Sequence, residues 1–298
     1  MRQFRPNLQE LFDRPILEQD ELDPGFEDHG SLVFRVRTSR EHVIARAFRR
    51  DAVEGSFWGN IQTLFGANPL AASEVVPIHS LLAAISPIPV PSVLRVGTAD
   101  DREWLVVQLM QGSPLKNFDD LSDDGLIEFG RNLGSIHMRR FDSLGNPSGS
   151  VRFPPSEFPR RLANVFRHSV DTYPEDARLS RLVDDMCAAA TELPPPNEGA
   201  LVMLDIFPGQ FLQKEHRIVA MIDVDAYVVG PRELDFICLE FFIDDRAGTL
   251  ISRGYNEIRS LPRLDQVRLV YRYFFRLLTM IGTDLDVEDW MTWPKSFR

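Results

Sequence analysis

Two aspartates in one stretch are the first residues of this sequence that suggest chemistry. In the stretch from Leu201 to Tyr227, which reads LVMLDIFPGQFLQKEHRIVAMIDVDAY, Asp205 and Asp223 each follow a short apolar run. A carboxylate in apolar surroundings costs free energy unless it binds a cation, a proton or a row of N–H donors. We therefore expect a functional role for both. A structural alternative stays open, in which Asp205 caps a turn and Asp223 pairs with one of the many arginines.

The segments around the two aspartates predict how they are positioned. The runs ALVMLD and RIVAMIDVD are short and apolar, and the turn-like FPGQ and the polar QKEH lie between them. Short apolar runs bounded by turn residues are typical of strands. We expect two strands or strand-like loops that meet near Asp205 and Asp223.

The first part of the chain predicts a small antiparallel sheet that carries one helix. Alternating residues over Leu32–Val36 and His42–Phe48, joined by the turn-like RTSRE, indicate a β-hairpin. Apolar residues at helical spacing then indicate a helix with Pro77 in its first turn: Val75, Ile78, Leu82 and Ile85. Two further strands are expected in PIPVPSVLRVG and EWLVVQLM.

From Gly112 onward the pattern becomes helical. An amphipathic helix is expected around DDGLIEFGRNLGSIHMRRF, with Asp123 or Asp124 as its N-cap, and its apolar face consists of Leu126, Phe129, Leu133 and Ile136. Further helices are expected in FPRRLANVFRHSV, ARLSRLVDDMCAAATEL and LDQVRLVYRYFFRLLTMIG. The sequence thus predicts an α+β fold of two lobes: a β-rich lobe over residues 1–111 and a larger, mainly helical lobe over residues 112–298 with a strand pair inserted.

Composition excludes several classes of protein. The formal net charge of −11 argues against a surface that coats nucleic acid. The sequence contains no apolar run of the length that crosses a membrane, and its charged start is unlike a signal peptide, so we expect a cytoplasmic protein without membrane contact. Cys187 and Cys238 lack metal-type spacing and are expected to be buried free thiols. Lysine is absent before Lys116, so any cationic role in the first lobe falls to arginine.

The stretch around the aspartates resembles a family of nucleotide-dependent phosphotransferases. Leu201 to Asp205, then Gln210 and Leu212, and then the run from Ile222 to Asp225 follow the pattern of the aminoglycoside phosphotransferase and choline kinase family. GRNLGSIHM upstream and GPRELDFICLE downstream also resemble family segments, so the resemblance extends from about Gly25 to Gly282. It implies a protein-kinase-like fold with a nucleotide-covering first lobe.

The resemblance implies a role for each residue of the motif. Asp205 would accept or orient the proton of the acceptor hydroxyl, which requires an ionised carboxylate. Asp223 would bind a Mg²⁺ ion that bridges the nucleotide phosphates, with Gln210 as a second ligand. Gln210 stands where the family has asparagine, and its extra methylene moves the amide oxygen by ~1.5 Å. Met203 and Leu204 replace the family's histidine and glycine.

The nucleotide side of the site is expected in the first lobe and at the connection between the lobes. The resemblance places Arg46 on the strand that carries the phosphate-binding cation, and Glu74 on the helix that supplies its partner. Gly25, Gly30 and Ser31 match the phosphate-covering loop in position. The segment from Gln108 to Gln111, with Gln108 and Met110, would hold the nucleobase, which is that of ATP or GTP. The alternative for Arg46 is an exposed position on a strand.

Two further residues are expected to support the site from within the core. His137 lies on the apolar side of its helix and is expected to be structural. Asp235 resembles the family's buried aspartate, which accepts N–H bonds from the catalytic loop.

The acceptor side is expected in the helical lobe. A group of acidic and tryptophan residues could bind an amine-bearing sugar or a quaternary ammonium: Asp244, Asp245, Asp284, Asp286, Glu288, Asp289, Trp290 and Trp293. The alternative is that these are solvated helix ends. The expected function is a small-molecule kinase that transfers the γ-phosphate of ATP or GTP to a hydroxyl of an aminoglycoside-like molecule, an amino alcohol or a sugar. The competing hypothesis is a catalytically silent scaffold that binds nucleotide or another ligand.

Overall fold

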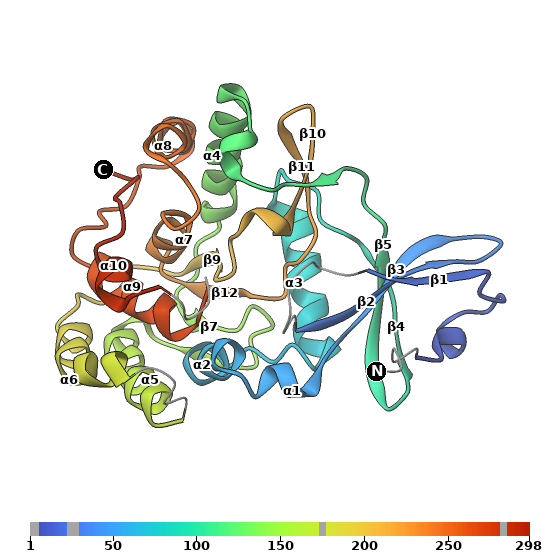
Figure 1. Ribbon diagram of the computed structural model, residues 1–298, viewed down its shortest axis with the longest axis horizontal. Helices are drawn as coiled ribbons and strands as arrows, with labels where there is room; N and C mark the ends of the chain where they lie inside the picture. The colour runs from blue at the N-terminus through green and yellow to red at the C-terminus, as the bar shows by residue number, and fades with distance from the viewer. Residues whose placement is uncertain (1–5, 23–29, 173–176, 281–284) are drawn as a thin grey trace.

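The protein combines an antiparallel sheet in the first part of the chain with a larger, mainly helical part (Figure 1). The computed structural model describes residues 6–22, 30–172, 177–280 and 285–298. The expectation of an α+β fold with a β-rich first part and a helical second part is confirmed.

The sheet of the first part has five strands in the order β1-β2-β3-β5-β4, and all neighbours are antiparallel. Their bounds are β1 Glu18–Glu21, β2 Ser31–Arg37, β3 His42–Phe48, β4 Val93–Ala99 and β5 Arg102–Gln108. Trp104 and Val106 of β5 pack in one core with the short helix η1 (Leu8–Leu11), whereas Leu105 and Val107 pack against α3 (Ala72–Ile85) on the other face. This alternation follows from the period of a strand.

The register of the sheet places Arg46 on the α3 face. Arg46 of β3 pairs with Leu105 of β5, and residues directly opposite in a pair share a face. Its neighbour Ala45 is fully buried in the core on the other face. Helix α3 lies between the sheet and the helical part of the molecule (Figure 1), so Arg46 faces the region between the two.

Helix α3 begins earlier than its sequence suggested. It starts at Ala72, so Pro77 lies inside the helix and not in its first turn. Proline in a helix interior removes one backbone hydrogen bond and costs about 3 kcal/mol. Burial of Val75, Ile78 and Leu82 against the sheet and the second lobe offsets this cost.

Two closely packed helices form one side of the helical part. In α4 (Asp123–His137) the predicted face of Leu126, Phe129, Leu133 and Ile136 is buried. The N-cap is Ser122 and not an aspartate, because its hydroxyl accepts the N–H of Gly125 at 3.1 Å. Helix α8 (Asp245–Ile258) packs against α4 through glycines: a Cβ on Gly130 would lie 2.1 Å from the carbonyl oxygen of Ile251. The backbones approach so closely only because the side chain is absent.

A second group of helices packs around α5 and α9. The bounds of the remaining α-helices are α1 Arg50–Val53, α2 Ser56–Phe65, α5 Phe158–Thr172, α6 Ala177–Thr191, α7 Glu233–Leu239, α9 Arg268–Leu277 and α10 Val287–Met291. Helix α2 precedes residue 112 but packs against α5 and α9. Three short 3-10 helices lie at η2 Phe118–Asp120, η3 Pro155–Glu157 and η4 Pro208–Gln210.

Two small sheets hold the stretch with the two aspartates. Strand β9 (Ala200–Met203) pairs with β12 (Tyr227–Gly230), and β12 also pairs with β7 (Leu144–Gly145), which β8 (Arg152–Phe153) extends. Strand β10 (Phe211–Lys214) pairs with β11 (Arg217–Met221) and with β6 (Ser113–Pro114). The two predicted runs are therefore strands, but each pairs with a different partner.

A buried ion cluster fastens the C-terminal segment to the helical part. Glu240 is fully buried and accepts hydrogen bonds from Arg268 at 3.2 Å and from Arg272 at 2.8 Å. The same two arginines donate to the backbone oxygens of Phe297 and Pro294. Both arginines thus pair with the buried carboxylate, as burial of charge requires, although Nε of Arg272 has no hydrogen-bond partner among the described residues.

Both cysteines are buried and free, as expected. Among the described residues, no helix combines the length and the apolar character needed to span a membrane.

Candidate active site

Asp205 lies in a tight loop directly after β9. The backbone N–H of Phe207 donates to the carbonyl oxygen of Asp205 at 3.0 Å, and the N–H of Gln210 donates to that of Phe207 at 3.1 Å. The side chain of Gln210 turns back, and its Nε2 donates to Oδ2 of Asp205 at 2.5 Å. These bonds fix the carboxylate at the end of the strand.

The surroundings of Asp205 disfavour its charge. Burial and the nearby carboxylate of Asp223 raise the pKa of Asp205 from 3.8 to about 8, and the Gln210 amide offsets only part of this effect. A carboxyl group with this pKa holds and releases a proton near neutral pH, which is the range that suits a general base or acid.

Asp223 follows β11, and a backbone bond ties this strand end to the Asp205 loop. The N–H of Ile222 donates to the carbonyl oxygen of Gln210 at 2.9 Å. The Asp223 side chain is 40% exposed, and its Oδ1 accepts a hydrogen bond from Nη2 of Arg46 at 3.1 Å. The structure thus brings Asp205, Gln210, Asp223 and Arg46 together, although they come from three separate elements.

Arg46 is buried and makes a second ion pair, with Asp225, at 2.5 Å. Burial would lower the pKa of its guanidinium, but Asp225 and Asp223 outweigh this and hold the pKa above its ordinary value. Arg46 is therefore a permanent cation beside Asp223. The alternative of an exposed arginine on a strand is wrong, because only 5% of Arg46 is exposed.

The expected pair between Arg46 and Glu74 is not formed. The Glu74 carboxylate accepts hydrogen bonds from Ser148 and, at 2.9 Å, from Ser150. Glu74 lies in the first turn of α3, because the helix begins at Ala72, and there it reaches the serine turn. Arg46 instead forms ion pairs with the carboxylates of Asp223 and Asp225.

Of the other residues of the expected nucleotide side, Ser31 reaches the cluster. It begins β2, and its Oγ lies 3.5 Å from Nη2 of Arg46, while the carbonyl oxygen of the preceding Gly30 accepts the N–H of Arg49 at 2.8 Å. Gln108 ends β5 with its side chain exposed, and Met110 is half-buried in the segment between β5 and β6. Gly25 lies outside the described residues.

A buried chain of polar groups supports the loop from behind. Oδ1 of Asp235 accepts the N–H of Met203 at 2.7 Å, and its Oδ2 meets Nε2 of His137 at 3.0 Å. The other ring nitrogen of His137 meets the hydroxyl of Tyr255 at 3.1 Å. Both Asp235 and His137 are fully buried, as the sequence indicated. Leu204 fits the loop without a positive φ, since it is not among the described non-glycine residues that adopt one.

The donor atoms of the cluster suit a Mg²⁺ ion. Asp223 offers a partly exposed carboxylate, and the amide oxygen of Gln210 is a second oxygen donor, since its nitrogen is the atom turned to Asp205. No group of three or more His, Cys, Asp or Glu side chains that could hold a metal is found among the described residues. Mg²⁺ nevertheless commonly binds through one or two protein ligands, with waters and substrate phosphates completing its shell.

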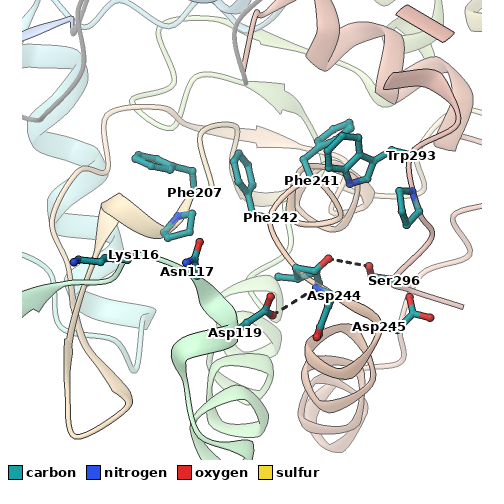
Figure 2. A pocket seen from close by; sticks show the side chains of 13 residues that line it. Lys116, Asn117, Asp119, Phe207, Phe241, Phe242, Asp244, Asp245, Trp293 and Ser296 are labelled. Carbon is teal, nitrogen blue, oxygen red and sulfur yellow. Dashed lines mark hydrogen bonds between the residues drawn. The ribbon is translucent and has the colours of Figure 1, made fainter. Parts of the chain in front are cut away.

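A cavity of about 630 Å³ adjoins the Asp205 loop (Figure 2). Phe207 and Pro208 of the loop form one wall, and Phe241, Phe242 and Trp293 form another. The acidic side chains of Asp119, Asp244 and Asp245 border it, with Lys116 at one end (Figure 2). Burial and the neighbouring Asp244 raise the pKa of Asp119. The cavity therefore combines aromatic faces with an excess of carboxylates.

Only part of the acidic group expected at the acceptor side reaches this cavity. Asp244, Asp245 and Trp293 line it. Asp286 caps α10 and pairs with Arg178, and Trp290 is fully buried, stacked on Phe241. Glu288 and Asp289 are exposed, as the alternative of solvated helix ends predicted, and Asp284 lies outside the described residues.

Residues 27–269 match the model of a family described as the phosphotransferase enzyme family. The chain belongs to this family. No curated protein sequence matches the chain significantly.

Solved structures of phosphotransferases share the fold of this family member. One is the macrolide 2'-phosphotransferase MphH from Brachybacterium faecium, with a TM-score of 0.61 and 15% identity over 92% of this chain and 88% of that one. Another is a thermostable mutant of the aminoglycoside phosphotransferase APH(4)-Ia in a ternary complex with ADP and hygromycin B, with a TM-score of 0.60 and 16% identity over 92% and 90% of the chains. A third is a putative fructosamine-3-kinase from Haemophilus somnus, with a TM-score of 0.59 and 15% identity over 96% and 92%.

Several residues of this phosphotransferase received no role from the sequence. Asp225 ended the motif run without a role of its own, and His79 carried no motif, yet both extend the Arg46 cluster. Phe207 and the pair Phe241–Phe242 line the cavity, and their signal was their position directly after the Asp205 loop and after the GPRELDFICLE segment. Asp119 had no signal, because only folding brings it beside Asp244.

Proposed function

We propose that this phosphotransferase transfers the γ-phosphoryl group of ATP or GTP to a hydroxyl of a small molecule. The single observation that carries the proposal is the meeting of Asp205, Gln210, Asp223 and Arg46 beside a cavity whose wall begins at Phe207. Phosphoryl transfer needs mainly positioning and positive charge, and this cluster supplies a carboxyl group, a buried cation and oxygen donors.

In this proposal Asp205 accepts, or orients, the proton of the acceptor hydroxyl. Arg46 stabilises the negative charge of the nucleotide phosphates with a guanidinium that stays protonated. Asp223 and Gln210 would hold Mg²⁺, which when bound neutralises charge on the phosphates. Asp235 and His137 keep the Asp205 loop in place. Gly30, Ser31, Gln108 and Met110 are proposed to surround the nucleotide, and residues 1–111 and 112–298 to act as the two lobes.

The cavity next to Phe207 is proposed as the acceptor site. Its aromatic walls suit an apolar or sugar face, and its carboxylates suit an amine or a quaternary ammonium. The neighbours named for a macrolide, hygromycin B and a fructosamine kinase support a hydroxyl-bearing acceptor of this class. Aminoglycoside-like molecules, amino alcohols and amino sugars are therefore the first candidates.

The test is consumption of Mg²⁺-ATP and Mg²⁺-GTP against a panel of aminoglycosides, macrolides, choline-like amines, sugars and homoserine. Asp205→Asn should abolish transfer and keep nucleotide affinity, because the residue acts on the acceptor proton. Asp223→Ala should abolish the Mg²⁺-dependent part of nucleotide binding. Transfer by Asp205→Asn at the wild-type rate would contradict the proposal.

One observation favours a second candidate, a catalytically silent ligand-binding protein. The Nε2 of Gln210 donates to Asp205, which engages the atom that a base would use, and Arg46 pairs with Asp223. Such a protein would bind nucleotide without consuming it for any acceptor of the panel. Asp205→Asn would then leave every measured property of binding unchanged.

A further inference from the structure

A buried group of three charged or polar side chains joins three elements next to Asp223. Arg46 comes from β3, Asp225 from the segment after β11, and His79 from the middle of α3. They are 5%, 3% and 2% exposed. Nη2 of Arg46 meets Oδ2 of Asp225 at 2.5 Å, and Nε2 of His79 lies 3.8 Å from Oδ1 of Asp225.

The contact of Nδ1 with the backbone fixes the orientation of the His79 ring. Nδ1 lies 2.8 Å from the backbone oxygen of Pro91. A carbonyl oxygen only accepts, so Nδ1 carries a proton and donates it. Nε2 is then the atom that faces Asp225, and it can donate to this carboxylate when the ring carries a proton on both nitrogens. Among the described residues, Nε2 of His79 and Oδ1 of Asp225 are both buried without a hydrogen-bond partner, and they lie 3.8 Å apart.

The two carboxylates that pair with Arg46 differ in accessibility. The Asp223 side chain is 40% exposed and accessible to a ligand, whereas that of Asp225 is 2% exposed. Oδ2 of Asp225 lies 2.5 Å from Nη2 of Arg46, so this buried carboxylate stays paired with Arg46 when Asp223 binds another partner.

We propose that Asp225 and His79 are positioning residues that hold Arg46 toward the nucleotide phosphates, in place of a glutamate from the helix. Helix α3 then reaches the cation through His79 and Asp225, while Glu74 bonds to the serine turn of Ser148 and Ser150. The inference rests on the proposed function, because it assigns these residues to the binding of the nucleotide by Arg46.

Two substitutions of His79 separate the contact of Nδ1 with Pro91 from the contact of Nε2 with Asp225. His79→Asn keeps a donor for Pro91 but removes the arm toward Asp225, whereas His79→Gln keeps a donor on the Asp225 side. We expect His79→Asn to raise the nucleotide KM about tenfold with a small change in kcat, and His79→Gln to restore part of the loss. Glu74→Gln is the matched control on the same helix and should leave the nucleotide KM unchanged. Thermal melting of each variant monitors folding.

A double-mutant cycle tests whether His79 acts through Arg46. In an Arg46→Gln background, His79→Asn should cause no further loss of nucleotide affinity, because the group that it positions is gone. Affinity is measured by calorimetry with Mg²⁺-ATP and Mg²⁺-GTP. If His79→Asn does not fold, Asp225→Asn replaces it in the same cycle, with the same expected coupling.

The outcomes distinguish this inference from the proposed function. Additive losses in the cycle, or a loss for Glu74→Gln equal to that for His79→Asn, would overturn the positioning role while wild-type binding and transfer stand. A lower melting temperature for His79→Asn with an unchanged nucleotide KM would do the same. A wild-type protein that binds neither nucleotide would overturn the proposed function and this inference with it.

Discussion

The replacement Asp205→Asn is expected to stabilise the ligand-free protein while it removes activity. The pKa of Asp205 is raised from 3.8 to about 8 by burial and by Asp223, so the folded state keeps a proton that the unfolded chain releases. The contribution of this proton to the free energy of unfolding is therefore fully present below pH ~4 and is lost progressively as the pH rises toward about 8. Asparagine is neutral at every pH, so the stability of the Asp205→Asn variant does not decrease with this titration.

The magnitude follows from the size of the shift. Each pKa unit corresponds to about 1.4 kcal/mol, and pH 7 lies roughly three units above the pKa of an unfolded aspartate, which sets an upper limit of about 4 kcal/mol. Part of the Asp205 side chain remains exposed, so solvent reduces the effect. We expect Asp205→Asn to be more stable by roughly 2 kcal/mol at pH 7, and by much less at pH 5.

The assay is urea denaturation followed by tryptophan fluorescence between pH 5 and 8, without Mg²⁺ or nucleotide. The difference between wild type and variant isolates the titration of one residue. Asp225→Asn is the control with the opposite pH dependence. Burial disfavours the charge of Asp225, but Arg46 and His79 outweigh burial and lower its pKa. The charged carboxylate therefore contributes to the free energy of unfolding above pH ~4. This control should be less stable than wild type by a constant amount across the range. A difference for Asp205→Asn that is independent of pH, or a less stable Asn variant at pH 8, would refute the reasoning.

Two further substitutions test the acceptor cavity and a helix cap. Asp244→Asn keeps the cap on α8 but removes a charge from the cavity, so KM for a cationic acceptor should rise about tenfold with the nucleotide KM unchanged. The matched change Asp286→Asn, at the cap of α10, should leave acceptor KM alone, and equal effects would count against this cavity as the acceptor site. Ser122→Ala removes the side chain that accepts the N–H of Gly125 and should lower the free energy of unfolding by about 1 kcal/mol in urea denaturation. Ser135→Ala in the same helix serves as its control, and a similar loss there would show that the cap is not responsible.

The elements that the sequence predicted well are those whose patterns depend on one face or one loop. The strand His42–Phe48 and the buried face of α4 follow directly from their periodicity. The loop of Asp205 and the strand end of Asp223 could be placed near each other because both follow short apolar runs. These patterns are local in the sequence, so the elements can be predicted from them without knowledge of the tertiary packing.

The features that could not be predicted depend on contacts between distant parts of the chain. Helix α8 contains Gly248 and Gly254, which lower helix propensity, and close packing explains both. A Cβ on Gly254 would lie 1.9 Å from the carbonyl oxygen of Ile127 in α4, and a Cβ on Gly248 would lie 2.2 Å from that of Ser296 in the C-terminal segment. The resemblance placed Glu74 as the partner of Arg46, and spacing alone cannot tell which side chain of α3 faces this arginine. The start of the helix at Ala72 turns His79 inward and Glu74 toward the serine turn.

The ion cluster around Glu240 has a consequence for how recognition can change. The segment that it fastens supplies Trp293, Pro294 and Ser296 to the cavity, but it contributes no side chain to the group around Asp205 and Arg46. Substitutions in these last residues would therefore alter the cavity without replacing a side chain of the group around Asp205 and Arg46. Because Phe207 and Pro208 of the Asp205 loop also line the cavity, its two walls are encoded in separate regions of the chain.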